Sequence, residues 1–201
     1  MLVVVVGPSG AGKDTLMARA REMLGDDPRF RFVRREITRP AEAGGEDHIA
    51  VTPEAFAARR DAGAYALSWE AHGLGYGIPA DVAGDVAAGR VVIANISRAK
   101  IAEAALRFPV LALEISAPAD VLAARLAARG RETAEDIARR LAREVGLPEG
   151  VRVSRVMNDR SAEDGAEAVV RVLKEASGSF LQKRTKKLLV VCWSSGAHAS
   201  K

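Results

Sequence analysis

The stretch that decides the fold is Leu2-Val-Val-Val-Val-Gly-Pro-Ser-Gly-Ala-Gly-Lys-Asp-Thr15. Its first five residues form an uninterrupted apolar run rich in β-branched valine, which is typical of a strand buried on both faces in a parallel sheet. From Lys13 onward apolar residues recur at intervals of three and four, which predicts a helix. A strand, a glycine-rich turn and a helix in this order predict an α/β protein.

The turn between the strand and the helix matches the pattern G-x-x-x-x-G-K, with Gly7, Gly12 and Lys13 at its fixed positions. Glycine tolerates the dihedral angles that point successive backbone N–H groups inward, and it allows a close approach to a ligand. The helix that follows adds the positive end of its dipole. We therefore expect this turn to bind phosphate groups, with Lys13 reaching the β- and γ-phosphates.

Asp14 is a departure from the pattern, because Ser or Thr is usual there and its hydroxyl contacts Mg²⁺. A carboxylate is also a hard oxygen ligand, so Asp14 is a candidate Mg²⁺ ligand, directly or through water. The alternative is that Asp14 only complements the positive helix N-terminus. Thr15 is a candidate for a phosphate contact. The sequence leaves both interpretations of Asp14 open.

An arginine-rich segment spans residues 125–143. Arg125 and Arg129 lie four apart on one predicted helical face, Gly130 allows a turn, and Arg140 lies on the helix predicted after it. Guanidinium groups on two linked helices suit a lid that closes over phosphates and excludes water. A solvated helix pair with internal ion pairs is the alternative, and the neighbouring phosphate loop favours the lid.

The remaining chain alternates apolar runs with helical stretches, which predicts a three-layer α/β/α sandwich around a mostly parallel sheet. Residues 34–80 interrupt this alternation with Gly, Pro and charged residues, and we expect them to form a small insertion over one end of the sheet. Further strands are predicted at 91–94, 110–115 and 151–156, and helices near 98–107, 118–128, 133–145 and 162–176.

Length and composition indicate one soluble domain, because the 201 residues are 48% hydrophobic and carry a net charge of only +4. A single cysteine, Cys192, excludes an internal disulfide framework. No apolar run approaches a membrane span or a signal peptide, so we expect a cytoplasmic protein without membrane contacts.

The positive charge belongs to the tail. Residues 178–201 carry five basic and no acidic side chain, so residues 1–177 have a net charge of −1. Without a basic face or interleaved aromatic residues on the body, we expect no nucleic-acid partner. The sequence leaves three interpretations of the tail open, a flexible end, a docked segment and an atypical extension, and it favours a solvated end over an acidic partner. The sequence does not determine the oligomeric state, for which a dimer is one candidate.

These motifs resemble the guanylate-kinase-like group of P-loop kinases, and within it the bacterial branch that phosphorylates ribose 1,5-bisphosphate in phosphonate catabolism. The segments that carry the resemblance are residues 7–16, 35–40, 44–48, 67–79 and 94–98. The resemblance implies a P-loop kinase domain over residues 1–177, with an acceptor-binding insertion at about 34–80 and a lid at about 125–143.

The resemblance also implies ATP as the donor and Mg²⁺ as the cofactor. It assigns catalysis to Lys13, Arg129 and Arg140, and it places Asn158 near the adenine, although Asn158-Asp159 also fits a simple strand-ending turn. The residues expected to bind ATP are Gly7, Pro8, Ser9, Gly10, Ala11, Gly12, Lys13, Asp14, Thr15, Arg125 and Asn158.

For the acceptor, the resemblance points to Arg35, Arg39, Glu46 and Tyr76. Guanylate kinases read guanine with acidic residues, where this chain has Ser68 before Trp69 and Ala94-Asn95 after a strand; His48 replaces one of the two tyrosines that hold the acceptor phosphate. A site that lacks its polar partners loses discrimination for a base.

We therefore expect the acceptor to be a sugar phosphate, ribose 1,5-bisphosphate, converted to 5-phosphoribosyl 1-diphosphate with release of ADP. A phosphate acceptor is already anionic at neutral pH and needs no general base. The alternatives are a guanylate kinase that phosphorylates GMP and a non-catalytic guanylate-kinase-like binding module.

Overall fold

The main sheet of the computed structural model has five parallel strands in the order β2-β7-β1-β8-β9. The structure describes residues 1–43, 46–128 and 146–196. The strands are β1 (Leu2–Val6), β2 (Phe30–Phe32), β7 (Val91–Asn95), β8 (Val110–Ser116) and β9 (Arg152–Met157). The central position of β1 explains why its sequence is apolar throughout, because both of its faces are covered.

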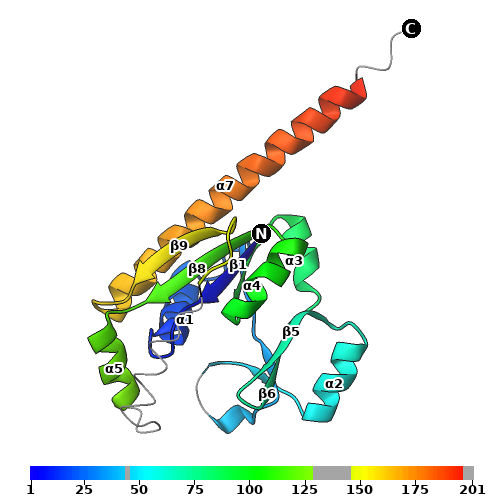
Figure 1. The fold of residues 1–201 in the computed structure, drawn as a ribbon. Coiled ribbons are helices and arrows are strands. Elements are labelled where there is room, and N and C mark those ends of the chain that lie inside the picture. Colours follow the sequence, from blue (N-terminus) through cyan, green and yellow to red (C-terminus); the bar gives the residue numbers. More distant parts are fainter. Residues whose placement is uncertain (44–45, 129–145, 197–201) are drawn as a thin grey trace.

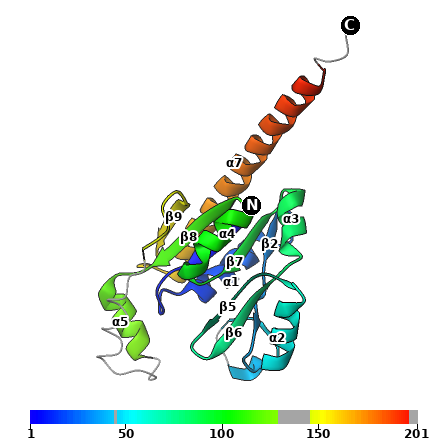
Figure 2. The ribbon, with the colours of Figure 1, turned by 45° about the vertical axis from the view of Figure 1, so that its right-hand side comes forward.

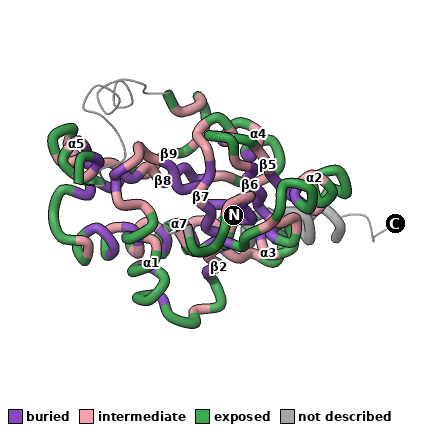
Figure 3. Tube along the Cα trace, turned by 90° about the horizontal axis from the view of Figure 1, so that it is seen from below, coloured by how far each residue is buried: buried purple, intermediate pink, exposed green. Residues whose placement is uncertain are grey.

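Alternate residues of β1 belong to different cores. Val3 and Val5 lie in one cluster of buried side chains, whereas Leu2, Val4 and Val6 lie in the other. All five are at most 1% exposed. The central strands form a buried band surrounded by exposed helical surfaces (Figure 3). Because successive side chains of a strand point to opposite faces, burial of all five requires that both faces of the sheet are covered.

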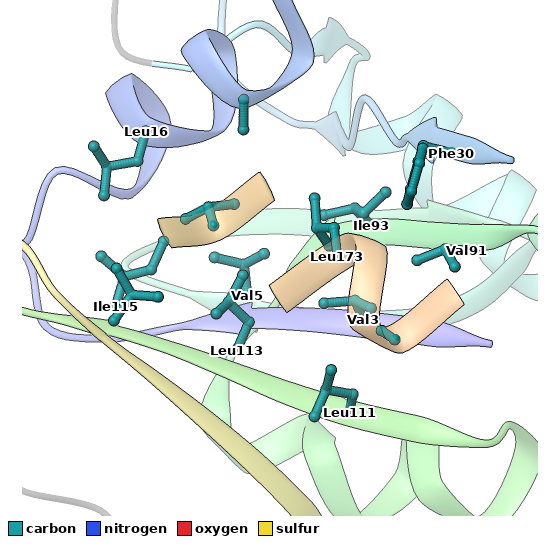
Figure 4. Close-up of a cluster of buried hydrophobic side chains, with 14 of the residues drawn as sticks. Val3, Val5, Leu16, Phe30, Val91, Ile93, Leu111, Leu113, Ile115 and Leu173 are labelled. Carbon is teal, nitrogen blue, oxygen red and sulfur yellow. The ribbon is translucent and has the colours of Figure 1, made fainter. Parts of the chain in front are cut away.

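Helices cover both faces of the sheet (Figure 1). On one face Leu16 of α1 and Leu173 of α7 meet the side chains of Val5 and Ile115 in the cluster of Figure 4. The other face is covered by α3 and α4, whose buried side chains join the second cluster. The helices are α1 (Lys13–Leu24), α3 (Val82–Ala88), α4 (Ile101–Arg107), α5 (Ala119–Ala127) and α7 (Ala162–Gly196).

This arrangement confirms the predicted three-layer α/β/α fold with a mostly parallel sheet. The predicted strands 91–94, 110–115 and 151–156 correspond to β7, β8 and β9. β2 and α3 were not predicted from the sequence. The stretch expected to be helical at 133–145 lies outside the described residues.

Helix α7 is much longer than the stretch 162–176 predicted for it. It is continuous over 35 residues, and its later half extends away from the sheet (Figure 2). Ala176 and Ser177 are buried and Phe180 packs on the core, so the boundary expected at residue 178 falls inside a helix. Over the described part of the chain, no helix combines the length and the apolar character needed to cross a membrane.

The insertion between β2 and α3 forms a second sheet in the order β4-β3-β6-β5, packed by one helix. Its antiparallel β5–β6 pair turns through His72 and Gly73, which both have positive φ angles, of 53° and 73°. Such a two-residue turn matches the twist of a hairpin. Its elements are β3 (Glu36–Ile37), β4 (Ile49–Ala50), α2 (Pro53–Asp61), β5 (Tyr65–Ala71) and β6 (Leu74–Pro79).

Gly7, where the chain leaves β1, has no room for a side chain. Its φ is 147°, and a Cβ atom there would lie 1.9 Å from the backbone oxygen of Ile115 on β8. The loop after β1 therefore passes directly over the backbone of the neighbouring strand, which only glycine permits.

We expect Gly7→Ala to lower the free energy of unfolding by about 1–3 kcal/mol from backbone strain, with the overlap on Ile115 adding to this. Urea denaturation measures the change. Gly84→Ala in α3 is the control, because a Cβ atom there would meet no atom of another segment within 4 Å. Alanine inside a helix should raise the free energy of unfolding by about 0.5–1 kcal/mol. Equal stability of Gly7→Ala and the unsubstituted chain would contradict the close approach.

Candidate active site

The phosphate loop lies at the carboxyl end of β1, between β7 and β8. The strand order reverses here, which is where open α/β sheets bind ligands. Gly10 and Gly12 have φ angles of 84° and 83°, and Gly12 forms the N-cap of α1 in a left-handed conformation. No described side chain caps this helix, so its first amide groups and its dipole are directed at the loop.

Lys13 lies over this loop. Its Nζ donates hydrogen bonds to the backbone oxygens of Gly7, at 3.0 Å, and Pro8, at 2.9 Å. These carbonyl groups hold the ammonium group at the loop, where phosphate oxygens can replace them as acceptors. A charge-assisted bond to phosphate is stronger than a bond to a neutral carbonyl.

Asp14 and Thr15 are exposed in the first turn of α1. The Asp14 Oδ1 accepts a hydrogen bond from Asn95 Nδ2 at 3.4 Å, so the end of β7 reaches the loop. Among the described residues, no group of three or more His, Cys, Asp or Glu side chains can hold a metal ion. An exposed carboxylate beside a phosphate loop still fits Mg²⁺, which commonly takes one or two carboxylates together with substrate phosphates and water.

Asn158, at the end of β9, faces the backbone of the phosphate loop. Its side chain amide donates to the Ala11 oxygen at 2.8 Å, and its backbone N–H donates to the Ser116 oxygen at 2.7 Å. The residue is only 5% exposed. Arg125 on α5 donates from Nη2 to the Asn158 backbone oxygen at 3.3 Å.

The predicted lid is described only at its start. Arg125 lies in α5, which ends at Ala127. Arg129, Arg140 and the other lid arginines lie outside the described residues, so their expected contacts with the donor phosphates remain predictions.

The four residues predicted for the acceptor lie in one part of the insertion. Arg35 forms an ion pair with Glu46 through two hydrogen bonds. Its guanidinium carbon lies 4.9 Å from the ring centre of Tyr76 and 5.7 Å from that of Trp69. The two rings stack at 5.3 Å with an interplanar angle of 6°. Arg35 is therefore fixed by an acid and by two aromatic faces.

Arg39 joins this group through His48. The His48 Nε2 lies 3.1 Å from the Arg39 backbone oxygen, and its Nδ1 lies 3.0 Å from the Glu46 backbone oxygen and 3.4 Å from Arg39 Nη2. His48 is only 5% exposed. The sequence placed His48 where guanylate kinases have a tyrosine for the acceptor phosphate, and in the structure its ring contacts the backbones of Arg39 and Glu46.

The opposite face of the insertion sheet is structural. Glu36, 4% exposed, accepts from Arg59 at 2.7 Å and from the Tyr65 hydroxyl at 2.5 Å. A Cβ atom on Gly77 would lie 2.4 Å from the Tyr65 ring, and one on Gly75 would lie 2.8 Å from the Phe56 ring of α2. These glycines let the two rings lie flat on the sheet. Ser68 pairs with Gly77, so it belongs to this face.

A cavity of about 510 Å³ lies between α1, from Asp14 directly after the phosphate loop, and the insertion. Asp14 and Asn95 line it at the loop, and Glu46 lines it at the insertion. Five Asp or Glu and two Arg side chains contribute to its wall, and both arginines pair with Asp47. An acidic wall suits sugar hydroxyl groups, which donate hydrogen bonds to carboxylates.

The cavity thus lies beside the phosphate loop, from Asp14 and Asn95, and reaches Glu46 and Asp47 of the insertion. This architecture defines the chain as a P-loop kinase. The fold agrees with the crystal structure of a guanylate kinase from Anaplasma phagocytophilum, which superposes with a TM-score of 0.63 at 19% identity and covers 88% of this chain and 85% of that one. The chain belongs to the ribose 1,5-bisphosphate phosphokinase family, as its relatives show.

The chain is 48% identical over 180 residues to the ribose 1,5-bisphosphate phosphokinase PhnN of Agrobacterium fabrum, covering 89% of this chain and 98% of the relative. For the protein of that name from Acidiphilium cryptum, identity is 49% over 172 residues, or 86% and 91% of the two chains. It also matches 25% of a bifunctional ribose 1,5-bisphosphokinase-thymidine phosphorylase of Azorhizobium caulinodans, with 52% identity over 84% of this chain. No protein-family model matches the chain.

The Tyr65 hydroxyl gives a test of the structural face. Burial, and then the hydrogen bond to the Glu36 carboxylate, raise the pKa of Tyr65 to about 12. In a spectrophotometric titration the Tyr65 phenolate should form only near that pH, and Tyr65→Phe should remove the step. The chain has two tyrosines, so Tyr76→Phe is the control that should keep it. A Tyr65 step near the ordinary pKa, about 10, would contradict the buried contact with Glu36.

Proposed function

We propose that this chain transfers the γ-phosphoryl group of ATP to the 1-phosphate of ribose 1,5-bisphosphate, forming 5-phosphoribosyl 1-diphosphate and ADP. The observation that carries the proposal is the cavity between α1 and the insertion, which Asp14, directly after the phosphate loop, lines at one end and Glu46, the partner of Arg35, lines at the other. Family membership supports the same reaction, because the relatives are named for ribose 1,5-bisphosphate.

On the donor side, the loop amides and the N-terminus of α1 bind the β- and γ-phosphates, and Lys13 exchanges its two carbonyl acceptors for phosphate oxygens. Asp14, held by Asn95, is the residue that would hold Mg²⁺, which neutralises phosphate charge when bound. Arg129 and Arg140 complete the donor site as lid residues in this proposal.

On the acceptor side, Arg39 holds the reacting phosphate. Among the described residues its guanidinium group contacts His48 and pairs with no carboxylate, whereas the Arg35 charge is already matched by Glu46. Because its charge is matched, Arg35 serves to hold the Tyr76 ring, which it contacts face-on. In this proposal the Tyr76 hydroxyl binds the same phosphate as Arg39. The carboxylates of the cavity wall accept hydrogen bonds from the ribose hydroxyl groups.

The chemical step needs no general base. An oxygen of the acceptor 1-phosphate is anionic at neutral pH and attacks the γ-phosphorus while the bond to the β,γ-bridging oxygen breaks, which leaves ADP. Positive groups that are fixed before the reaction stabilise the charge on the transferred oxygens. The described residues fit this role through Lys13 and the loop amides.

The acceptor is tested by turnover with ATP and three compounds: ribose 1,5-bisphosphate, ribose 5-phosphate and GMP. We expect the highest kcat/KM with the bisphosphate, because Ser68 and Asn95 provide no carboxylate for a guanine edge. Phosphorus NMR identifies the new diphosphate. A clear preference for GMP would instead identify a guanylate kinase, and no ATP consumption with any acceptor would favour a binding module.

Lys13→Ala should reduce kcat by about 10²–10³-fold, the scale of removing one preorganised donor to a developing charge. Steady-state kinetics with saturating ATP and ribose 1,5-bisphosphate measure the effect. Lys100→Ala is the matched control, because Lys100 pairs with Glu103 on α4 and its loss should leave kcat unchanged. A Lys13→Ala enzyme with normal kcat would refute the donor role.

A further inference from the structure

We infer that Asn158 is a positioning residue: it fixes the phosphate loop in its binding conformation and does not recognise the adenine base. The inference rests on the proposed binding of ATP at this loop. It assigns Asn158 a different role from the one that the family resemblance implies.

The contacts of Asn158 all connect parts of the protein. Its side chain amide holds the Ala11 oxygen of the loop at 2.8 Å, and its backbone N–H holds the Ser116 oxygen of β8 at 2.7 Å. Arg125 holds its backbone oxygen at 3.3 Å. The phosphate loop, the end of β8 and the helix that leads to the lid therefore meet at this one residue.

Two glycines make room for the Asn158 side chain. A Cβ atom on Gly12 would lie 2.4 Å from Asn158 Nδ2, and one on Gly165, in the first turn of α7, would lie 3.3 Å from Asn158 Oδ1. Gly12 is also the residue that turns the loop into α1. The side chain amide is thus enclosed between the loop and α7, a fit that a free strand-ending turn does not require.

This enclosure prevents recognition of a base. Recognition of an adenine edge needs amide atoms that a ligand can reach, but Asn158 is 5% exposed and its Nδ2 is engaged by Ala11. Its Oδ1 is buried without a hydrogen-bond partner among the described residues, on the side of Gly165. The amide therefore stabilises the loop that binds phosphates, whatever base the nucleotide carries.

The test measures binding of ATP, GTP and inorganic tripolyphosphate, a probe without a base, by titration calorimetry. Asn158→Ala removes the amide, and Asn158→Leu removes it while keeping a branched side chain of similar size. Both variants should bind all three ligands more weakly by the same factor, about 10-fold, the scale of one hydrogen bond at a buried site. Val169→Ala, a substitution in the buried core of α7, is the control for general destabilisation.

A loss confined to ATP would show adenine recognition and overturn the inference, as would unchanged binding of all three ligands. An equal loss in Val169→Ala would also overturn it, because the effect would then follow from stability. If the unsubstituted chain binds no triphosphate, the proposed function itself fails and the inference fails with it. Equal losses in both Asn158 variants, with normal binding by Val169→Ala, would support the positioning role.

Discussion

The whole site depends on how closely the phosphate loop packs on the ends of its neighbouring strands. Gly7 passes the β8 backbone with no space for a Cβ atom, and Ala11 is held by the Asn158 amide. A loop fixed in this way has its amide groups oriented before any ligand arrives. Ordering a backbone costs conformational entropy. Because this loop is already ordered in the folded protein, less of the ligand's binding free energy is offset by that cost.

Charge is distributed unequally between the phosphate loop and the insertion. At the loop the positive elements are Lys13 and the N-terminus of α1, whereas in the insertion the Arg35 charge is matched by Glu46. The cavity between them has an acidic wall. A highly charged acceptor can enter such a site only if its phosphates reach the few cations that no carboxylate neutralises. Its sugar hydroxyl groups must then donate hydrogen bonds to the carboxylates of the wall. This division favours a ligand with phosphate at defined positions and hydroxyl groups between them.

The sequence predicted the parts that depend on local patterns. The run Leu2–Val6 and the glycines that follow predicted the central strand and the loop because burial, turn and helix start are encoded within fifteen consecutive residues. β2 was missed because three residues show no period. The length of α7 was missed because the sequence of its later half mixes basic and apolar residues and does not fit the alternation of strands and helices seen earlier in the chain.

Side-chain partnerships were beyond reach of the sequence for a different reason. Arg35 and Glu46 were both selected for the acceptor. Their pairing, and the stacking of Arg35 on Trp69 of β5 and Tyr76 of β6, form only when these separate segments come together in the folded insertion. Asn158 and Ala11 are 147 residues apart. Their contact forms only when the sheet is complete. The type of residue therefore indicated that Asn158 belongs to the site, but only the tertiary structure shows which groups it contacts.

The two faces of the insertion sheet differ: one packs aromatic rings against the sheet, and the other carries the cluster of Arg35, Trp69 and Tyr76. Gly75 and Gly77 accommodate the rings of Phe56 and Tyr65 on one side, while Tyr76 between them points to the other side with Trp69 and Arg35. Since neighbouring residues of a strand point in opposite directions, replacing Tyr76 leaves the ring-packed side intact. The face that carries Tyr76, Trp69 and Arg35 can therefore change during evolution through single substitutions, without first destabilising the sheet that carries it.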